Sequence, residues 1–430
     1  MVDAPINSLQ KAACHAEPPP PILNPLKTPY PQDLAWPEHL RPFDPLDHSI
    51  QADPYPYYRW MRENAPVLRT KTALGDAWYL SRHRDVVQVL RAPKVFSSEL
   101  YDPKKAPQVL FMDDPDHTRL RGAVATFFTP KAVARLEGKI RELAGKYFAP
   151  ILSSGVAEVM EGFAAPLTMD MITSLLGLPL SDTEKFRRWS QDWVNYSGRL
   201  TGNSPGSPTD ESGTMAFVDY ITKALETIPP DGDSILSNIV RCRAEGTMTE
   251  QEAKFFSHVL FTAGHETTMI LIANGMAQLA EMPHLLARLR DKPRDIPAFV
   301  EEMARYKPPI HRLRRITTQE AEISGHVIPA RSHVRLLIVA ANRDPEKFPE
   351  PDVFNMDRDT GGHLGFGFGV HSCLGSWLAR LETRIVFELI AEKVSRIELY
   401  PDPTHAAVPF TGGSMANSGP KSLTLRLTPA

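Results

Sequence analysis

Cysteines, long apolar runs and dense basic clusters are all scarce in this sequence. Its 430 residues include three cysteines, Cys14, Cys242 and Cys373. So few thiols, in an odd number, argue against a disulfide framework and predict a protein of a reducing compartment, the cytoplasm. No apolar run is long enough to span a bilayer, and residues 1–15 have no signal-like apolar segment. A net charge of −3 without a dense Lys/Arg run argues against nucleic-acid binding.

Proline, in contrast, is abundant, with 40 residues, twelve of which lie between Pro18 and Pro56. Such a segment favours extended, polyproline-like backbone. We therefore predict that residues 1–52 form an extended and partly disordered N-terminal segment. At this length one large domain or two are possible, and the hydrophobic content of 42% suffices for a sizeable core.

The most unusual stretch is Phe366–Gly375, in which glycine and phenylalanine alternate before a histidine and the cysteine Cys373. The apolar spacing that follows predicts a helix that starts at once and places Cys373 at its N-terminus. Free N–H groups and the helix dipole stabilise a thiolate there. Glycines let the backbone approach the sulfur closely. The helical face is formed by Leu374, Leu378, Leu381 and Ile385.

The isolated cysteine restricts which metal sites are compatible with this stretch. Zinc requires several Cys or His ligands at short spacing, and the three cysteines are far apart. Covalent haem attachment requires C-x-x-C-H, which is absent. A single thiolate suits haem iron, whose four in-plane ligands come from the porphyrin. The alternative is a buried free cysteine before a core helix.

A second unusual stretch lies within a predicted helix that begins with a capping box at Thr249 and Glu252 and ends at Met282. Its length is roughly 50 Å, enough to cross a domain. The centre reads Ala263-Gly264-His265-Glu266-Thr267-Thr268, and glycine and threonine are poor helix formers. The Thr267 hydroxyl can bond the carbonyl of Ala263 and loosen the helix. This pattern indicates a site, in which we expect His265 to be structural.

Other patterns predict further elements. They are a hairpin with strands at 67–69 and 77–80, a short helix capped by Ser81, a strand over 334–339, a mobile loop over 198–213 and a final strand over 422–427.

Both unusual stretches resemble the cytochrome P450 superfamily. Phe366, Gly369, His371, Cys373 and Gly375 match its haem-binding pattern F-x-x-G-x-[H/R]-x-C-x-G. The helix centre is similar to its [A/G]-G-x-[D/E]-T-[T/S] segment. The resemblance implies that residues 53–430 form a single domain. It also implies a mainly α fold with small β-sheets (α+β), in which haem b lies between the long central helix and the helix after the cysteine loop.

The same resemblance assigns residues around the haem. Cys373 would be the axial iron ligand, and haem-binding residues would also include Phe366, His371, Gly264 and Ala263. A segment similar to D-P-P-x-H-x-x-x-R would bind the haem propionates through His117 and Arg121, with Arg315 as a third contact. Without the resemblance, that segment reads as a solvated helix start. The pair Glu302 and Arg305 resembles a buried E-x-x-R motif, with Arg358 as its third partner.

As a function, the resemblance implies a soluble, monomeric haem-thiolate monooxygenase. Thr267 and Glu266 would manage protons for the reaction of O2 with a small-to-medium hydrophobic substrate. No reductase segment is visible up to Ala430. Electrons are therefore expected from NAD(P)H through a reductase and an acidic ferredoxin, steered by Arg119 and Arg121.

The substrate is less constrained by these patterns. By analogy, its pocket is expected to be formed by residues 96–112, 189–217, 259–267, 310–312 and 411–418, with hydroxyls at Ser97 and Ser98. Arg312 or His311 could pair with a substrate carboxylate. Three alternatives stay open: a peroxide-driven or non-redox haem-thiolate enzyme, a non-enzymatic haem sensor or carrier, and a helical protein without a cofactor.

Overall fold

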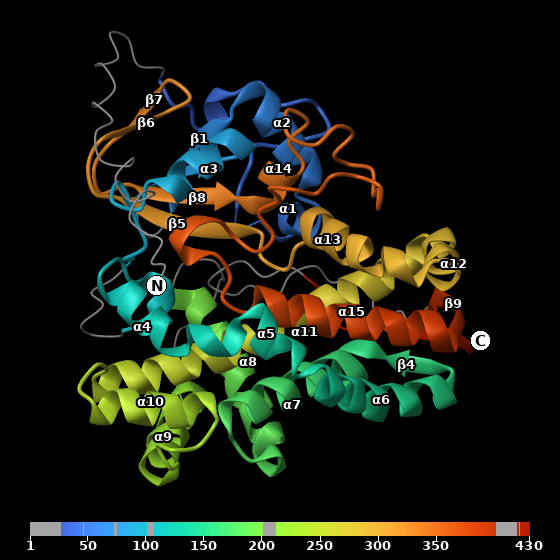
Figure 1. Cartoon of the computed structure of the whole chain (residues 1–430). Coiled ribbons are helices and arrows are strands. Elements are labelled where there is room, and N and C mark those ends of the chain that lie inside the picture. The colour runs from blue at the N-terminus through green and yellow to red at the C-terminus, as the bar shows by residue number, and fades with distance from the viewer. Residues whose placement is uncertain are drawn as a thin grey trace, which may run out of the picture.

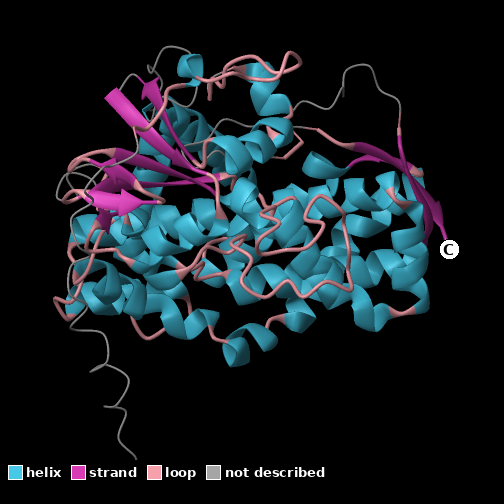
Figure 2. Ribbon diagram, turned by 90° about the horizontal axis from the view of Figure 1, so that it is seen from above, coloured by secondary structure: helices cyan, strands magenta, loops and turns pink. Residues whose placement is uncertain are grey.

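The computed structural model describes residues 27–45, 47–72, 75–100, 107–200, 212–400, 419–420 and 422–430. Most of these residues are helical, and the strands gather in two places (Figure 2). Two long helices, α11 (Glu250–Glu281) and α15 (Ser376–Lys393), cross the middle of the molecule between the side that carries the largest sheet and a mostly helical side (Figure 1). The predicted mainly α architecture with small sheets is therefore confirmed.

The other helices have the following bounds: α1 (His48–Ala52), α2 (Tyr55–Asn64), α3 (His83–Arg91), α4 (Asp116–Val124), α5 (Pro130–Ala134), α6 (Glu137–Ser154), α7 (Ala165–Leu176), α8 (Thr183–Leu200), α9 (Ser212–Thr227), α10 (Ile235–Ala244), α12 (Pro283–Asp291), α13 (Ile296–Tyr306) and α14 (Ile338–Asn342). Short 3₁₀ turns occur at η2 (Pro31–Asp33), η3 (Val109–Phe111), η4 (Ala125–Phe128), η6 (Leu180–Asp182), η7 (Pro293–Asp295) and η8 (Gly369–His371), and η5 (Met160–Ala164) is a π-helical turn.

The strands form three sheets. The largest has the order β1-β2-β8-β5-β3, with only β2 and β8 parallel among its neighbouring strands. The smaller sheets have the orders β4-β10-β9 and β6-β7. The strand bounds are β1 (Val67–Thr72), β2 (Gly75–Leu80), β3 (Phe96–Ser97), β4 (Val156–Glu158), β5 (Arg312–Thr317), β6 (Ala321–Ile323), β7 (His326–Ile328), β8 (His333–Leu337), β9 (Val394–Leu399) and β10 (Thr424–Pro429).

Helix α11 begins and ends as its sequence predicts. Thr249 accepts a hydrogen bond from the Glu252 N–H at 3.2 Å, and the Glu252 carboxylate accepts one from the Thr249 N–H at 2.8 Å. This reciprocal pair satisfies N–H groups that the first turn leaves without partners. The helix packs against α7, α9 and α15, so apolar residues surround much of its circumference.

The described residues 27–45 and 47–50 pack onto the rest of the fold. Phe43 and Ile50 are buried in a cluster with Tyr58 and Tyr79. The rings of Trp36 and Trp60 stack with centroids 4.0 Å apart. This part of the proline-rich segment therefore shares a hydrophobic cluster with α2 and the hairpin, whereas residues 1–26 lie outside the described residues.

Several predicted boundaries are wrong. Arg82, not Ser81, precedes the first turn of α3, and the Ser81 hydroxyl donates to the Pro66 carbonyl. Strand β8 ends at Leu337, and α14 begins at Ile338. Helix α8 extends to Leu200 and α9 begins at Ser212, so the predicted loop is shorter, and residues 201–211 lie outside the described residues.

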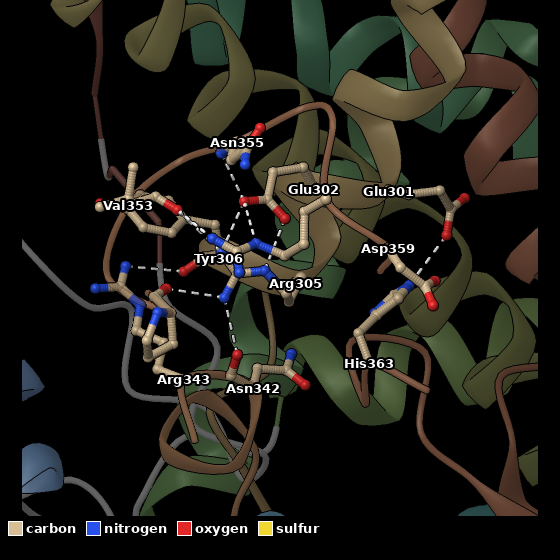
Figure 3. A network of polar contacts seen from close by, with 12 residues as sticks. Glu301, Glu302, Arg305, Tyr306, Asn342, Arg343, Val353, Asn355, Asp359 and His363 are labelled. Atoms are coloured by element: carbon tan, nitrogen blue, oxygen red, sulfur yellow. Dashed lines mark hydrogen bonds and ion pairs between the residues drawn. The ribbon is translucent and has the colours of Figure 1, made fainter. Parts of the chain in front are cut away.

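A buried ion network fixes α13 to the segment before the cysteine loop (Figure 3). Glu302 and Arg305 are fully buried and form an ion pair at 2.7 Å. Arg305 also donates to the carbonyls of Asn342 and Pro351, each at 2.9 Å. Arg358 reaches Glu302 at 3.4 Å, which confirms it as the predicted third partner.

Candidate functional site

A cavity of about 280 Å³ lies between α11 on one side and the cysteine loop with α15 on the other. Its walls are mostly apolar. From α11 they include Phe256, Val259, Leu260, Thr262, Ala263, Gly264, Glu266, Thr267, Thr268 and Leu271; from the cysteine loop and α15 they include Gly365, Phe366, Gly367, His371, Ser372, Cys373, Leu374, Gly375, Leu378 and Ala379. The two unusual stretches of the sequence therefore face the same space.

The cysteine loop is shaped by glycines that pack against neighbouring backbone. Gly367 and Gly369 have φ of +69° and +73°, which favours glycine. A Cβ on Gly369 would lie 2.7 Å from the Leu90 carbonyl oxygen at the end of α3. The Cys373 N–H donates to the Phe366 carbonyl at 2.8 Å, which closes the loop.

Helix α15 begins at Ser376, three residues after Cys373, so the predicted position of the cysteine at the helix N-terminus is wrong. Burial raises the pKa of the Cys373 thiol, whereas a hydrogen bond from the Gly375 N–H and the charges of Arg121 and Arg380 oppose that rise. Coordination to a metal ion would deprotonate such a thiol outright.

His117, Arg121 and His371 lie together at one end of the cavity. The rings of His117 and His371 have centroids 4.0 Å apart. Burial, together with the charges of Arg315, His117 and Arg121, lowers the pKa of His371 to about 3. The Nδ1 atom of His117 lies 3.6 Å from the Asp114 carboxylate. This part of the cavity thus combines the Arg121 cation with two imidazole rings, a set that suits an anionic group.

Arg315 lies behind this end of the cavity. It does not line the cavity, and its Nη1 donates to the Arg314 carbonyl at 2.6 Å. Burial lowers its pKa to about 10, and the nearby carboxylate of Asp113 opposes that shift. The positive charge of Arg315 helps to lower the pKa of His371.

On α11, the Thr267 hydroxyl donates to the Ala263 carbonyl at 3.2 Å, as predicted. Gly264 is required by packing, because a Cβ there would lie 2.6 Å from Cδ1 of Ile172 on α7. His265 is buried outside the cavity wall. Its Nδ1 donates to the Phe261 carbonyl at 2.9 Å, and its Nε2 lies 3.0 Å from the Ser190 hydroxyl. These contacts support a structural role for His265.

Several predicted pocket residues do not line the cavity. The Ser98 hydroxyl is bonded to His371 Nε2 at 3.0 Å, and Ser97 accepts the Glu99 N–H. Arg312 and His311 line a separate hollow of about 20 Å³ beside Tyr58. Of the predicted segments, residues 108–111, seven residues of 259–267 and Ile310 line the cavity, whereas the described part of 189–217 contributes none. Residues 411–418 lie outside the described residues.

Arg119 is held by other residues and is not available for steering a partner. It forms ion pairs with Glu252 at 2.5 Å and Asp116 at 2.7 Å. Arg121 faces the cavity. The basic residues that are exposed near the cysteine loop differ from those predicted. Arg91 lies over the Phe368 ring at 5.3 Å.

Sequence reasoning missed a second network beside the cysteine loop, formed by Glu301, His363 and Arg380. Arg380 lies only seven residues after Cys373, and this nearness in the sequence is the signal that could have identified it.

The residues around the cavity fit a haem. The described residues contain no cluster of three or more His, Cys, Asp or Glu side chains able to hold a metal ion. One thiol nevertheless faces an apolar cavity that is also lined by Arg121 and His117. Such a set suits an iron porphyrin, which brings four iron ligands of its own and carries carboxylates.

Comparison with known proteins agrees with this geometry. A family model, "Cytochrome P450", matches residues 296–406. The cytochrome P450 monooxygenase PikC of Streptomyces venezuelae is 35% identical over 374 residues, which is 83% of this chain and 88% of PikC. The chain belongs to the cytochrome P450 family. The erythromycin C-12 hydroxylase of Saccharopolyspora erythraea is 34% identical, with 80% of this chain and 87% of the hydroxylase covered.

Solved structures confirm the P450 fold. The crystal structure of CalO2 superposes with a TM-score of 0.80 at 30% identity, covering 90% of this chain and 99% of CalO2. CYP109Q5 from Chondromyces apiculatus gives a TM-score of 0.79 at 31% identity, with 90% and 98% covered. The chain is thus a bacterial-type P450 monooxygenase, and the family implies a haem-thiolate cofactor. No helix in the described part of the chain is both long and apolar enough to cross a membrane.

Proposed function

We propose that this P450 inserts one oxygen atom from O2 into a small-to-medium hydrophobic organic substrate by hydroxylation, epoxidation or O-dealkylation. The observation that carries the proposal is the Cys373 thiol facing a largely apolar cavity whose opposite wall carries Glu266 and Thr267. In this proposal the enzyme is a cytoplasmic monomer.

In this proposal the cofactor is haem b, held through its iron by Cys373. When bound, the haem supplies the activation of O2, which no side chain can supply. His117 and Arg121 would bind its carboxylates, with Arg315 behind them and His371 held by Ser98. Phe366, Ala263 and Gly264 would also lie against the haem, because they line the same cavity.

Thr267 and Glu266 would deliver protons to the reacting oxygen. Both side chains lie on the cavity wall, and the Thr267 hydroxyl is held by the Ala263 carbonyl at 3.2 Å. A hydroxyl fixed in this way keeps a lone pair available to accept a proton from a neighbouring acid.

The apolar wall favours a hydrophobic substrate. Two relatives are named as an erythromycin C-12 hydroxylase and a vitamin D(3) 25-hydroxylase, and hydroxylation is one of the proposed reactions. Because Arg312 lies outside the cavity, a substrate carboxylate is not expected to pair with it.

Electrons would come from NAD(P)H through a ferredoxin reductase and an acidic ferredoxin. The side chains of Val370 and Trp377 are exposed beside the cysteine loop. Arg91 is exposed near Phe368, and α5, which packs against α15, contributes the exposed Lys131. An apolar centre with basic neighbours is complementary to an acidic partner.

Spectroscopy tests the haem-thiolate assignment. The reduced protein with CO should show the red-shifted Soret band of thiolate ligation, and Cys373→Ala should lose it. Cys242→Ala is the control, since Cys242 does not line the cavity. A protein that binds no haem, or an unchanged spectrum in Cys373→Ala, would contradict the assignment.

Electron supply is tested separately. Product formation with NADPH should require both a ferredoxin and its reductase. Full turnover without a ferredoxin and without peroxide would exclude the ferredoxin, and efficient turnover with peroxide alone would favour the peroxide-driven alternative.

A further inference from the structure

Glu301 on α13 binds two residues that flank the cysteine loop. Its carboxylate forms a two-point ion pair with Arg380 of α15, at 2.5 Å to Nε and 3.0 Å to Nη2. It also lies 3.0 Å from Nε2 of His363, as the dashed line in Figure 3 shows. Because an arginine fork meets both carboxylate oxygens, the direction of the Arg380 side chain is fixed.

The hydrogen bonds of His363 fix the position of its proton. The Gly365 N–H donates to Nδ1 at 3.1 Å, so Nδ1 is the acceptor. The ring proton is therefore on Nε2 and is donated to Glu301. Neutral His363, Glu301 and Arg380 together have no net charge, and His363 connects the group to the backbone that leads into the cysteine loop.

The Arg380 side chain lies against the aromatic ring of Phe366, where the cysteine loop begins. Its guanidinium carbon is 4.1 Å from the centroid of the Phe366 ring, and the His363 ring approaches the same ring at 5.9 Å. The Phe366 carbonyl in turn accepts the Cys373 N–H at 2.8 Å. Glu301 thus holds the Arg380 cation against Phe366, the residue that is hydrogen-bonded to Cys373.

We propose that Glu301, His363 and Arg380 form a positioning triad that sets the electric field at the Cys373 sulfur and thereby the reduction potential of the bound haem. This inference rests on the proposed function. Charges and hydrogen bonds around a sulfur ligand are recognised means of tuning a metal site. The Arg380 charge stabilises extra negative charge at the iron and sulfur, and Glu301 offsets part of that effect.

The charges needed for this role are present. Burial raises the pKa of Glu301, but hydrogen bonds from His363 and Arg380 outweigh it and bring the pKa to about 2. The triad therefore presents an ionised carboxylate and a guanidinium cation beside Phe366, whose carbonyl accepts the Cys373 N–H.

Two charge-neutralising variants should shift the haem potential in opposite directions. Arg380→Gln removes the cation and leaves Glu301, so the potential should become more negative. Glu301→Gln removes the anion and leaves Arg380, so the potential should become more positive. We expect each shift to change the one-electron equilibrium about threefold to tenfold, where tenfold equals 59 mV. The measurement is a spectroelectrochemical titration of each purified holoenzyme.

Arg384→Gln is the matched control. Arg384 lies one turn along α15 and pairs with Glu137 and Glu388, each at 3.0 Å. Its replacement removes the same charge as Arg380→Gln, but from a side chain that does not contact Phe366. We therefore expect a shift in the haem potential of less than a third of that in Arg380→Gln. Arg380→Lys keeps the charge and should remain close to the parent potential.

The outcomes separate this inference from the proposed function. A parent protein without the thiolate Soret band overturns the function and this inference with it. A normal parent spectrum with shifts in the same direction, or none, overturns the triad alone. If Arg380→Gln loses haem, the contrast between Glu301→Gln and Arg380→Lys decides, and loss of haem in all three variants would identify a purely structural role and overturn the proposal.

Discussion

Glu382 on α15 is a buried carboxyl group whose oxygens both lack a hydrogen-bond partner among the described residues. Its side chain is fully enclosed, and burial raises its pKa well above the ordinary value of 4.5. Because a buried charge without a partner is very costly, Glu382 is protonated in the folded protein at neutral pH. Unfolding would ionise it, so Glu382 weakens the fold progressively as the pH rises above about 4.5.

Glu382→Gln should therefore flatten part of the pH dependence of stability. Below pH 4.5 the variant and the parent should be similarly stable, because Glu382 is protonated in both states. As the pH rises towards 8, the variant should become more stable than the parent, by about 1–3 kcal/mol in the free energy of unfolding. Guanidinium unfolding midpoints between pH 4 and 8 measure the difference. A variant that tracks the parent at every pH would show that Glu382 is ionised in the folded protein.

Thr267→Ala should separate electron use from product formation. Without the hydroxyl, proton delivery in the proposed reaction is impaired, and product per NADPH should fall by about tenfold or more. Thr222→Ala on α9 loses a comparable bond, from the hydroxyl to the Val218 carbonyl at 2.8 Å, away from the cavity. In Thr222→Ala, product formation should stay coupled to NADPH use. Equal coupling in both variants would remove Thr267 from the proton path and favour the peroxide-driven alternative.

At the scale of elements, the contact between α11 and α15 depends on Gly275. A Cβ there would lie 2.3 Å from Cζ of Phe387, whose ring is fully buried and cannot bend away. Gly275→Ala should therefore lower the free energy of unfolding by about 1–3 kcal/mol, although alanine favours helix. Because the two helices enclose the cavity, the variant should also retain haem less well.

Gly145→Ala on α6 is the control, because a Cβ there meets no atom within 4 Å. It should raise stability by about 0.5–1 kcal/mol. Phe387→Leu should restore part of the stability of Gly275→Ala by making room. Equal stability of Gly275→Ala and Gly145→Ala in guanidinium unfolding would show that α11 and α15 are less closely packed than described.

Elements with local signals were predictable from the sequence. The capping box of α11 and the hairpin β1–β2 are specified by residues that contact one another within the same segment. The start of α15 was not, because Leu374 has helical spacing while the Cys373 N–H bonds to Phe366 instead. The change from β8 to α14 also escaped prediction, since the apolar run from Leu336 to Val339 contains no glycine or proline to mark it.

At the scale of the whole molecule, the site brings together segments that are far apart in the sequence. The motif residues could be predicted because their types and order are specific, and nine of the ten predicted site residues line the cavity, Arg315 being the exception. The partners of charged and polar residues could not be predicted. Nothing near Arg119 in the sequence indicates Glu252, and nothing near His371 indicates Ser98. Only the fold decides which distant groups meet.

The N-terminal boundary can be tested at this scale. The sequence predicts a domain that begins at residue 53, whereas Phe43 is buried against Tyr57, Tyr58 and Tyr79. Phe43→Ala should therefore lower the free energy of unfolding by about 3–5 kcal/mol, because it leaves a cavity among these rings. A chain that starts at Asp53 should lose more stability than Phe43→Ala, since Ile50 and the stacking of Trp36 on Trp60 are removed as well.

Val353→Ala is the control for this boundary, because Val353 is 53% exposed and its replacement should change stability by less than about 0.5 kcal/mol. Guanidinium unfolding of the holoenzymes, followed at the Soret band and by circular dichroism, compares the variants. If the shortened chain and Phe43→Ala both unfold at the parent midpoint, the domain begins at residue 53 and residues 27–52 only cover it. A lowered midpoint in both would extend the domain to include the described proline-rich segment.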